Sequence, residues 1–245
     1  MNRFALATLI LATSTAAIAQ SGERRFEVGR FDAVELTGSD AVRVVPGAAF
    51  SVVAGGDPRA VAALTIDVRG NTLRVGRRPG NWRDKGAVVT VTMPAIRAAT
   101  ITGSGDLDVG RVAGAAFAGK VGGSGDLRLH DVRVRDARIE VGGSGNVTLD
   151  GNVAGALAID LSGSGDVVAR GNAGNVAVRL VGSGDIDTSA VRTARVQVDL
   201  SGSGDVKTFA SDTARVAAGG TGDVTVAGHP RCTVRKTGTA DVSCG

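Results

Sequence analysis

The sequence predicts an all-β protein whose main part is a parallel β-helix or β-solenoid of about eight coils, each 18–20 residues long. Three observations predict this fold. A Gly-Ser-Gly-Asp motif recurs at even spacing, aliphatic columns flank it on both sides, and the composition has 37 Gly but only 5 Pro. Abundant glycine without proline, with Val, Leu, Ile and Thr between, is typical of short strands joined by tight turns.

The motif sets the period of the repeat. Its acidic position is Asp in seven copies and Asn in one, and successive copies are 20, 20, 20, 19, 20, 18 and 18 residues apart. The eight positions are Asp106, Asp126, Asn146, Asp166, Asp185, Asp205, Asp223 and Asp241. Self-similarity at a fixed period of this length indicates a stacked repeat architecture.

Alignment on the acidic position reveals the strands. The residue after it is always aliphatic, and the residues five and seven positions before it are mostly aliphatic, with polar residues between them. This period-2 alternation predicts two half-buried strands in each repeat. An antiparallel meander would also alternate, but the same turn in every copy favours coils that wind in one direction and stack in register.

The glycines of the motif are expected to serve the turn. Glycine adopts positive φ without a Cβ clash, and stacked corners leave little room for side chains. The Asp or Asn side chain is expected to accept hydrogen bonds from the amides of its own turn.

Calcium binding is the alternative role for the motif. Gly-Gly-x-Gly-x-Asp nonapeptides bind Ca²⁺ between coils, whereas residues 122–126 lack one spacer residue and the motif recurs only once per coil. A structural turn is therefore favoured, and no cofactor is expected. The carboxylates that would form a calcium site are those of Asp106, Asp126, Asp166, Asp185 and Asp205.

The first residues have the form of a secretory signal. Arg3 gives a short positive region, residues 4–18 are apolar or small, and an Ala-x-Ala pattern places cleavage between Ala19 and Gln20. We therefore expect an exported protein, in the periplasm, the outer cell envelope or the medium, with no transmembrane segment in the mature chain. The expected division is a signal peptide over 1–19, an N-terminal β cap region over 20–96 and the repeat solenoid over 97–245.

The two cysteines indicate a disulfide. Cys232 and Cys244 both lie near the C-terminus of a chain predicted to be exported. They occupy inward positions on opposite sides of the last turn, so a bond between them would pin the final coil.

The N-terminal region lacks the 20-residue period but consists mostly of predicted strands. Asp57 and Pro58 are expected to start a short helix over residues 59–63, and Arg69-Gly70-Asn71 is expected to form a hairpin turn. An open solenoid end exposes strand edges, so this region is expected to cap the first coil.

Few residues indicate chemistry. The formal net charge is +4, and the one basic cluster, over residues 74–85, is interpreted as a solvated loop. Within it Trp82, Arg77 and Arg78 are candidates for partner contact, although a cap over the N-terminal core is the favoured interpretation of Trp82. The predicted export and the scarcity of aromatic residues argue against nucleic-acid binding.

One outward column contains His130, Asp150 and Arg170 in consecutive coils. A catalytic interpretation would make His130 a base oriented by Asp150. An exposed charge ladder explains the same residue types and is favoured. The sequence thus favours a non-enzymatic binding or structural protein that presents flat faces to a protein or glycan of the envelope. A polysaccharide-active or polysaccharide-binding β-helix is the alternative.

The order of the motifs resembles the family "putative auto-transporter adhesin, head GIN domain". The resemblance rests on the signal peptide, the strand over 31–36 with its Gly-Ser-Asp turn, residues 55–57, 73–75 and 90–94, the repeated turns and the closing Cys-x₁₁-Cys. It implies a solenoid-like all-β fold and an extracytoplasmic location, and it supplies no catalytic residues. The sequence ends at Gly245 without a membrane-barrel domain, so self-export is not expected.

Overall fold

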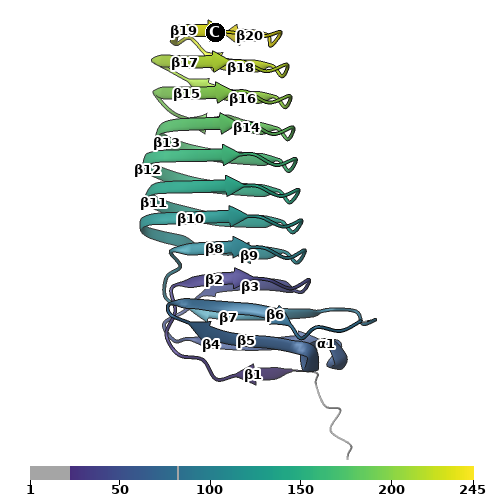
Figure 1. Ribbon diagram of the computed structural model, residues 1–245. Helices are drawn as coiled ribbons and strands as arrows, with labels where there is room; N and C mark the ends of the chain where they lie inside the picture. The colour runs from purple at the N-terminus through teal and green to yellow at the C-terminus, as the bar shows by residue number, and fades with distance from the viewer. Residues whose placement is uncertain (1–22, 82) are drawn as a thin grey trace, which may run out of the picture.

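The computed structural model describes residues 23–81 and 83–245, which form a β-solenoid of about seven turns on a β-rich base (Figure 1). Strands account for 62% of the chain and helix for 3%, so the predicted all-β solenoid is confirmed, and the predicted eight coils differ little from this number. The expected signal cleavage between Ala19 and Gln20 and the candidate contact Trp82 lie outside the described residues.

Each coil consists of one strand that enters the Gly-Ser-Gly-Asp turn and one that leaves it. We call the two stacks of strands the pre-turn sheet and the post-turn sheet. Strand β10 (Val112–Val121) enters the turn before β11. Where both strands join without a break around the far corner, they form the long strands β11 (Leu127–Val141), β12 (Val147–Leu161) and β13 (Val167–Leu180). Further along they separate into β14 (Ile186–Arg192), β15 (Arg195–Leu200), β16 (Val206–Ala210), β17 (Thr213–Ala218), β18 (Val224–Gly228), β19 (Arg231–Lys236) and β20 (Val242–Cys244).

The coils stack in parallel and in register. The residues after the turn pair from coil to coil in the order Leu127, Val147, Val167, Ile186, Val206, Val224 and Val242. All but the last are buried, with at most 1% of their surface exposed, so they form an aliphatic ladder along the axis. The predicted columns and their parallel stacking are therefore confirmed, and Figure 1 shows the turns aligned on one side of the rod.

The solenoid stacking begins before the repeats. Strands β2 (Ala33–Leu36) and β3 (Ala41–Pro46) pair in parallel with β8 (Ala98–Ile101) and β9 (Leu107–Val109). Below them, β6 (Thr72–Arg77) and β7 (Ala87–Met93) pair in parallel with β2 and β3. The hydrogen bonding is thus continuous across the boundary expected at residues 96 and 97.

Antiparallel strands close the base. Strand β5 (Leu64–Arg69) pairs with β6, β4 (Ser51–Gly56) pairs with β7, and β1 (Arg24–Phe26) pairs with β4. Helix α1 (Pro58–Ala63) connects β4 to β5 at the base, at the opposite end of the rod from β19 and β20 (Figure 1). The Asp57 carboxylate accepts a 2.9 Å hydrogen bond from the Arg59 amide, and Gly70 has φ +58° in the β5–β6 hairpin, so the predicted N-cap and hairpin turn are confirmed.

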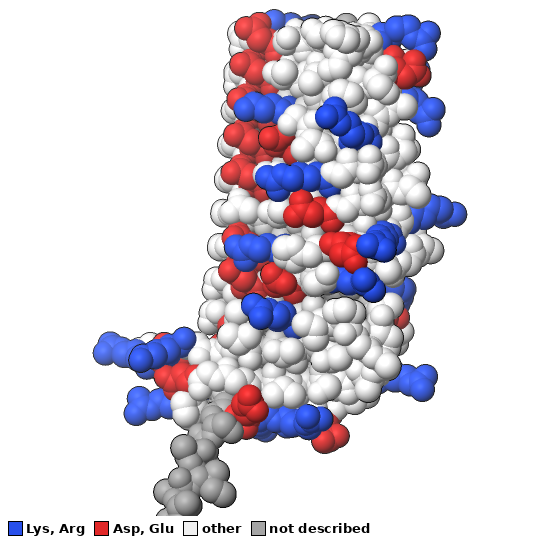
Figure 2. Space-filling model, turned by 180° about the vertical axis from the view of Figure 1, so that it is seen from behind, with Lys and Arg blue, Asp and Glu red and all other residues white. Residues whose placement is uncertain are grey.

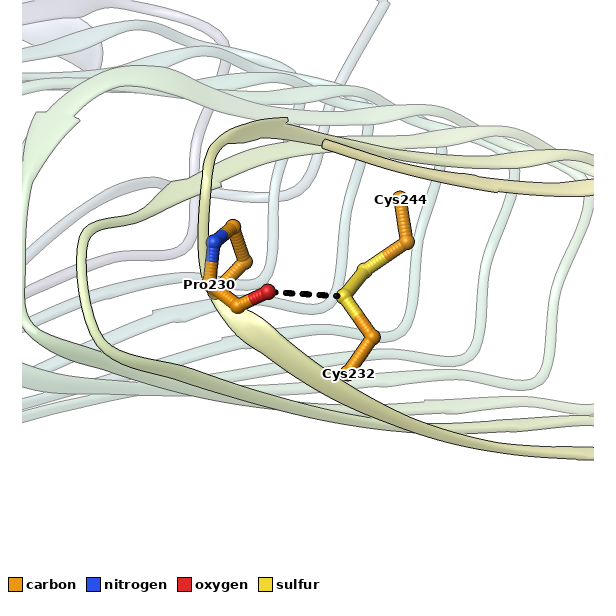
Figure 3. The surroundings of a disulfide bond; sticks show 3 residues. All are labelled: Pro230, Cys232 and Cys244. Atoms are coloured by element: carbon orange, nitrogen blue, oxygen red, sulfur yellow. Dashed lines mark hydrogen bonds between the residues drawn. A yellow bond between two sulfur atoms is a disulfide. The ribbon is translucent and has the colours of Figure 1, made fainter.

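The other end of the rod is bonded covalently. Cys232 and Cys244 form a disulfide that joins β19 to β20, and Cys232 Sγ lies 3.6 Å from the Pro230 carbonyl oxygen (Figure 3). Strand β19 is exposed along its whole length, and Val234, on a column that is buried in earlier coils, is 43% exposed. The disulfide therefore ties together the two strands of the least buried coil.

Candidate binding surface

The turn glycines are needed for close stacking. A Cβ on Gly125 would lie 1.9 Å from the Gly105 carbonyl oxygen, and one on Gly145 would lie 2.0 Å from that of Gly125. From Gly103 to Gly222 none of the glycines of the turn motif has positive φ, and Gly238 in the last, degenerate copy is the exception. The expectation of positive φ is thus wrong for these turns, because the approach of the preceding coil, not the turn conformation, excludes a side chain.

The acidic side chains bond the next coil rather than their own turn. In every copy from Asp106 to Asp223, Oδ1 accepts a hydrogen bond of 2.8–3.0 Å from the backbone N–H at the equivalent position of the following coil. The expected bonds to the amides of the same turn are therefore wrong, because parallel stacking brings the next N–H directly over the carboxylate. Figure 2 shows acidic side chains gathered along one edge of the rod.

The acidic column offers little to a metal ion. In the part of the chain that the structure describes, no group of three or more His, Cys, Asp or Glu side chains is arranged to hold a metal. At the five carboxylates considered for calcium, one oxygen is already bound to a backbone amide, and Arg128 also pairs with Asp126 at 2.8 Å.

His130 has a different partner from the one that a catalytic interpretation requires. Its Nε2 lies 3.3 Å from Asp108 Oδ2 in the preceding coil, and Asp150 pairs with Arg170 at 3.6 Å. The register shifts next to His130, where Asp131 has φ +45°. These exposed side chains form part of a charge ladder across the post-turn sheet.

Arg77 lies in a buried ion triad. Its side chain is 11% exposed and donates from Nε and one terminal nitrogen to Asp40, and from the other to Asp84 at 2.9 Å. Asp40 is 2% exposed and also accepts a 2.7 Å bond from the Ala87 amide. The two carboxylates raise the pKa of Arg77, while Arg77 and the Gly86 amide lower the pKa of Asp84.

The triad corrects the interpretation of the basic cluster. Arg77 has its donors occupied inside the protein, so it does not offer a contact to a partner. Arg78 is exposed and donates to the Ala62 carbonyl oxygen. No spacing in the sequence indicates the triad, because Asp40 and Arg77 meet only through the pairing of β2 with β6.

An apolar groove lies on the pre-turn sheet next to the base. It has a volume of about 760 Å³ and lies over β2, β8, β10, β11 and β12. Its floor is lined by alanines: Ala33, Ala95, Ala98, Ala113, Ala115, Ala116, Ala118, Ala137, Ala156 and Ala158. Because a methyl group is shorter than the side chains around it, this run of alanines forms a depression. We call it the alanine groove.

Charged side chains frame the alanine groove. Arg97 pairs with Asp32 at 2.7 Å, and Arg138 pairs with Glu140 at 2.6 Å and with Asp160 at 2.8 Å. Glu140 and Asp160 raise the pKa of Arg138, and Arg138 lowers that of Glu140. The pKa of Asp136 is lowered first by the Ala156 amide, 3.0 Å away, and then by Arg135.

A pattern in the sequence predicts the groove, and it lies at outward positions rather than in the inward columns. The outward position eight residues before the acidic residue is alanine in four of the first five copies: Ala98, Ala118, Ala158 and Ala177, with Arg138 between them. Outward alanines on neighbouring strands predict a shallow apolar strip, which the structure places at the base of the rod.

Comparison with known proteins agrees with this architecture. Residues 30–230 match the family described as "Putative auto-transporter adhesin, head GIN domain". The chain belongs to this family. The resemblance stated from the motifs is thus confirmed over most of the chain.

Several solved structures share the fold. A protein from Parabacteroides distasonis ATCC 8503, described as a putative adhesin, has a TM-score of 0.84 at 18% identity and covers 90% of this chain and 95% of its own. A second protein from that organism, described as a putative lipid binding protein, has a TM-score of 0.80 at 17% identity, with 91% and 96% covered. A putative adhesin from Parabacteroides merdae ATCC 43184 has a TM-score of 0.76 at 15% identity, with 90% and 94% covered. No curated protein matches the chain.

The described residues include no helix that is both long and apolar enough to cross a membrane. The disulfide and the adhesin-like family are compatible with an exported protein.

Proposed function

We propose that the chain is a non-enzymatic, extracytoplasmic, adhesin-like protein that binds a protein of the cell envelope or cell surface through the alanine groove. The observation that carries the proposal is the groove itself, an apolar hollow of about 760 Å³ that charged side chains frame on the pre-turn sheet. No cofactor or metal ion is part of the proposed activity.

The composition of the groove favours a protein partner. Protein interfaces combine an apolar centre with a polar rim that supplies hydrogen bonds. The alanine floor provides such a centre, and the ion pairs of Arg97 and Arg138 provide such a rim. A site for a neutral sugar would usually add an exposed aromatic platform, whereas Phe117 beneath the groove is only 3% exposed.

Other observations support the extracytoplasmic setting. The N-terminal residues have the pattern of a secretory signal, the chain carries a disulfide, and its family and two of the three structural neighbours compared above are described as putative adhesins.

Blocking the groove tests the proposal. Ala118 lies on its floor and is exposed, so Ala118→Arg should fill the hollow without disturbing the core. Ala177→Arg is the matched control, because Ala177 occupies the same column but lies outside the groove. Envelope proteins captured by the wild type are identified, purified and titrated against all three proteins.

We expect a partner whose affinity falls by about tenfold or more with Ala118→Arg and changes by less than about twofold with Ala177→Arg. Equal affinity for the wild type and Ala118→Arg, with the variant folded, would overturn the groove as the contact surface. Recovery of the protein in the cytoplasmic fraction alone would overturn the extracytoplasmic part of the proposal.

A further inference from the structure

The far end of the pre-turn sheet carries a hollow with an excess of positive charge. It has a volume of about 260 Å³ and lies over β15, β17 and β19, with Asp199, Arg215, Thr233 and Arg235 around Ala217. A second hollow of about 300 Å³ shares Asp199, Ala217 and Arg235 and adds Arg179, Ser201 and Thr237. Together they form what we call the arginine hollow.

The arginine hollow arises because one outward position of the pre-turn sheet lacks a carboxylate. On β11, Arg138 and Glu140 occupy the two outward positions before the turn and pair at 2.6 Å. On β17 the same two positions hold Arg215 and Ala217. The acid that neutralises the arginine in the earlier coil is thus replaced by a methyl group, which also creates the space.

The neighbouring coils do not supply the missing charge. Arg215 pairs in register with Gln197 and Thr233, and Arg235 pairs in register with Ala217. Asp199 accepts a 3.1 Å bond from Gln197 instead of joining either arginine. Among the described residues, Arg215 and Arg235 form no ion pair, whereas Arg74, Arg97 and Arg138 nearer the base all do.

We propose that the arginine hollow binds the carboxylate groups of an acidic polysaccharide. A guanidinium group matches a carboxylate with two parallel hydrogen bonds, and Arg215 and Arg235 lie exposed on either side of the space where one would fit. The hydroxyls of Thr233, Ser201 and Thr237 line the same surface and can bond the hydroxyls of a sugar.

The surrounding charges favour a polymer with spaced acids over an anionic membrane. Arg179 and Arg235 stand on one column three coils apart, roughly 14 Å at ~4.8 Å per coil, with Asp199 between them. A continuous anionic surface would bring its charges against Asp199 and Asp160, whereas an extended chain can place its carboxylates at the arginines and its neutral hydroxyls at the acids.

The test is a titration of the folded protein with a polyuronate of defined length at low ionic strength, with a neutral glucan of similar length as the control ligand. Two variants remove the site by different means. Arg215→Ala with Arg235→Ala removes the donors, and Ala217→Glu supplies the missing carboxylate from within, following the geometry of Arg138 with Glu140. The matched control is Arg43→Ala with Lys207→Ala, which removes two exposed charges from the post-turn sheet.

We expect polyuronate binding that weakens with salt, falls by about tenfold or more in both site variants and changes by less than about twofold in the control. Ala217→Glu should keep the melting temperature of the wild type, so its loss of binding would not reflect unfolding. Polyuronate bound no better than the neutral glucan, or bound equally by Ala217→Glu, would overturn the inference. Binding of inorganic phosphate or anionic phospholipid vesicles without polyuronate would overturn it as well.

The inference goes beyond the proposed function, because the arginine hollow and the alanine groove share no residue. Ala118→Arg should therefore leave polyuronate binding intact. Failure at one site leaves the result at the other unaffected.

Discussion

At the scale of single residues, the Arg77 side chain connects two segments of the base by buried ion pairs. It joins the first turn, through Asp40, to the loop before β7, through Asp84. All three side chains are nearly buried, with 11%, 1% and 4% of their surfaces exposed. A buried ion pair contributes little net stability when complete, but the loss of one partner leaves an uncompensated charge inside the protein.

Replacement of Arg77 should therefore be costly. We expect Arg77→Ala to lower the free energy of unfolding by about 3–5 kcal/mol, because Asp40 would remain buried without its cation. Urea denaturation measures the difference. Arg83→Ala, at an exposed position in the same loop, should stay within about 0.5 kcal/mol of the wild type. A change for Arg77→Ala as small as that of the control would show that the triad does not hold the loop.

The triad also predicts a dependence on acid. Arg77 and the Gly86 amide lower the pKa of Asp84 in the folded protein below its ordinary value. The stability that this carboxylate contributes is complete above its ordinary pKa and is lost as the pH falls through the lowered one. We expect the melting temperature to fall less steeply in Asp84→Asn than in the wild type between about pH 5 and pH 3. Parallel curves for the two proteins would contradict this prediction.

At the scale of elements, the turn is defined by contact between coils. Its glycines let one backbone lie against the carbonyl oxygen of the coil below, and its acidic residue bonds the amide of the coil above. Each turn is therefore specified by its two neighbours as much as by its own residues. This explains why the motif recurs with so little variation along the rod.

A methyl group at a stacked glycine should disrupt this contact. Gly145→Ala would place Cβ 2.0 Å from the Gly125 carbonyl oxygen, so we expect a loss of about 1–3 kcal/mol or more in the free energy of unfolding. Gly142 lies just before the turn, and a Cβ there meets nothing closer than 3.7 Å. Gly142→Ala should therefore be nearly neutral in the same denaturation experiment. Similar losses in both variants would show that close stacking is not the reason for glycine.

The acidic column should need an acceptor rather than a charge. Asn146 already occupies one position, accepts from the Asp166 amide and donates to Asp126. We expect Asp166→Asn to keep the stability of the wild type within about 0.5 kcal/mol, and Asp166→Ala to lose about 1 kcal/mol with the bond to the Asp185 amide. Equal losses in the two variants would indicate that the charge itself is required.

Melting curves with calcium and with a chelator accompany these variants. We expect no change in melting temperature in either, because one oxygen of each carboxylate is engaged by a backbone amide. A rise with calcium in the wild type that Asp166→Asn removes would show that the column binds the ion.

The sequence predicts the elements that follow a local period and misses those that do not. The aliphatic columns that begin at Ile101 and Leu107 predict the strands and their stacking, because alternation and the repeat are both visible along the chain. The sequence does not reveal the first coil, because its stacked neighbours Val42 and Leu107 are 65 residues apart in a protein whose period is near 20. The Arg77 triad and the two hollows depend on which outward residues meet across strands, and the inward columns carry no information about that.

At the scale of the whole molecule, the rod has unequal ends. The base is closed by antiparallel strands and α1, whereas the last coil has an exposed strand and the disulfide between Cys232 and Cys244. In a stacked repeat each coil contacts only its neighbours, so the effect of the disulfide should be confined to the end where it lies.

Loss of the disulfide should loosen the last coil alone. We expect faster amide hydrogen exchange in β19 and β20 of the double variant Cys232→Ser, Cys244→Ser, with exchange in β11 and β12 unchanged. Mass spectrometry of proteolytic fragments reads the two regions separately. Faster exchange throughout the rod, or unchanged exchange in β19, would contradict a local role for the bond.

Strands β2 and β3 lie between β6 and β7 below and β8 and β9 above. This placement affects the order in which the chain folds. These two strands cannot complete their hydrogen bonds until residue 109 has been synthesised, because their upper partners end there. The base is therefore assembled from contacts of long sequence separation, which close slowly, while each later coil docks on a finished edge about 20 residues behind it. Folding should thus be limited by the base and then proceed coil by coil toward Gly245.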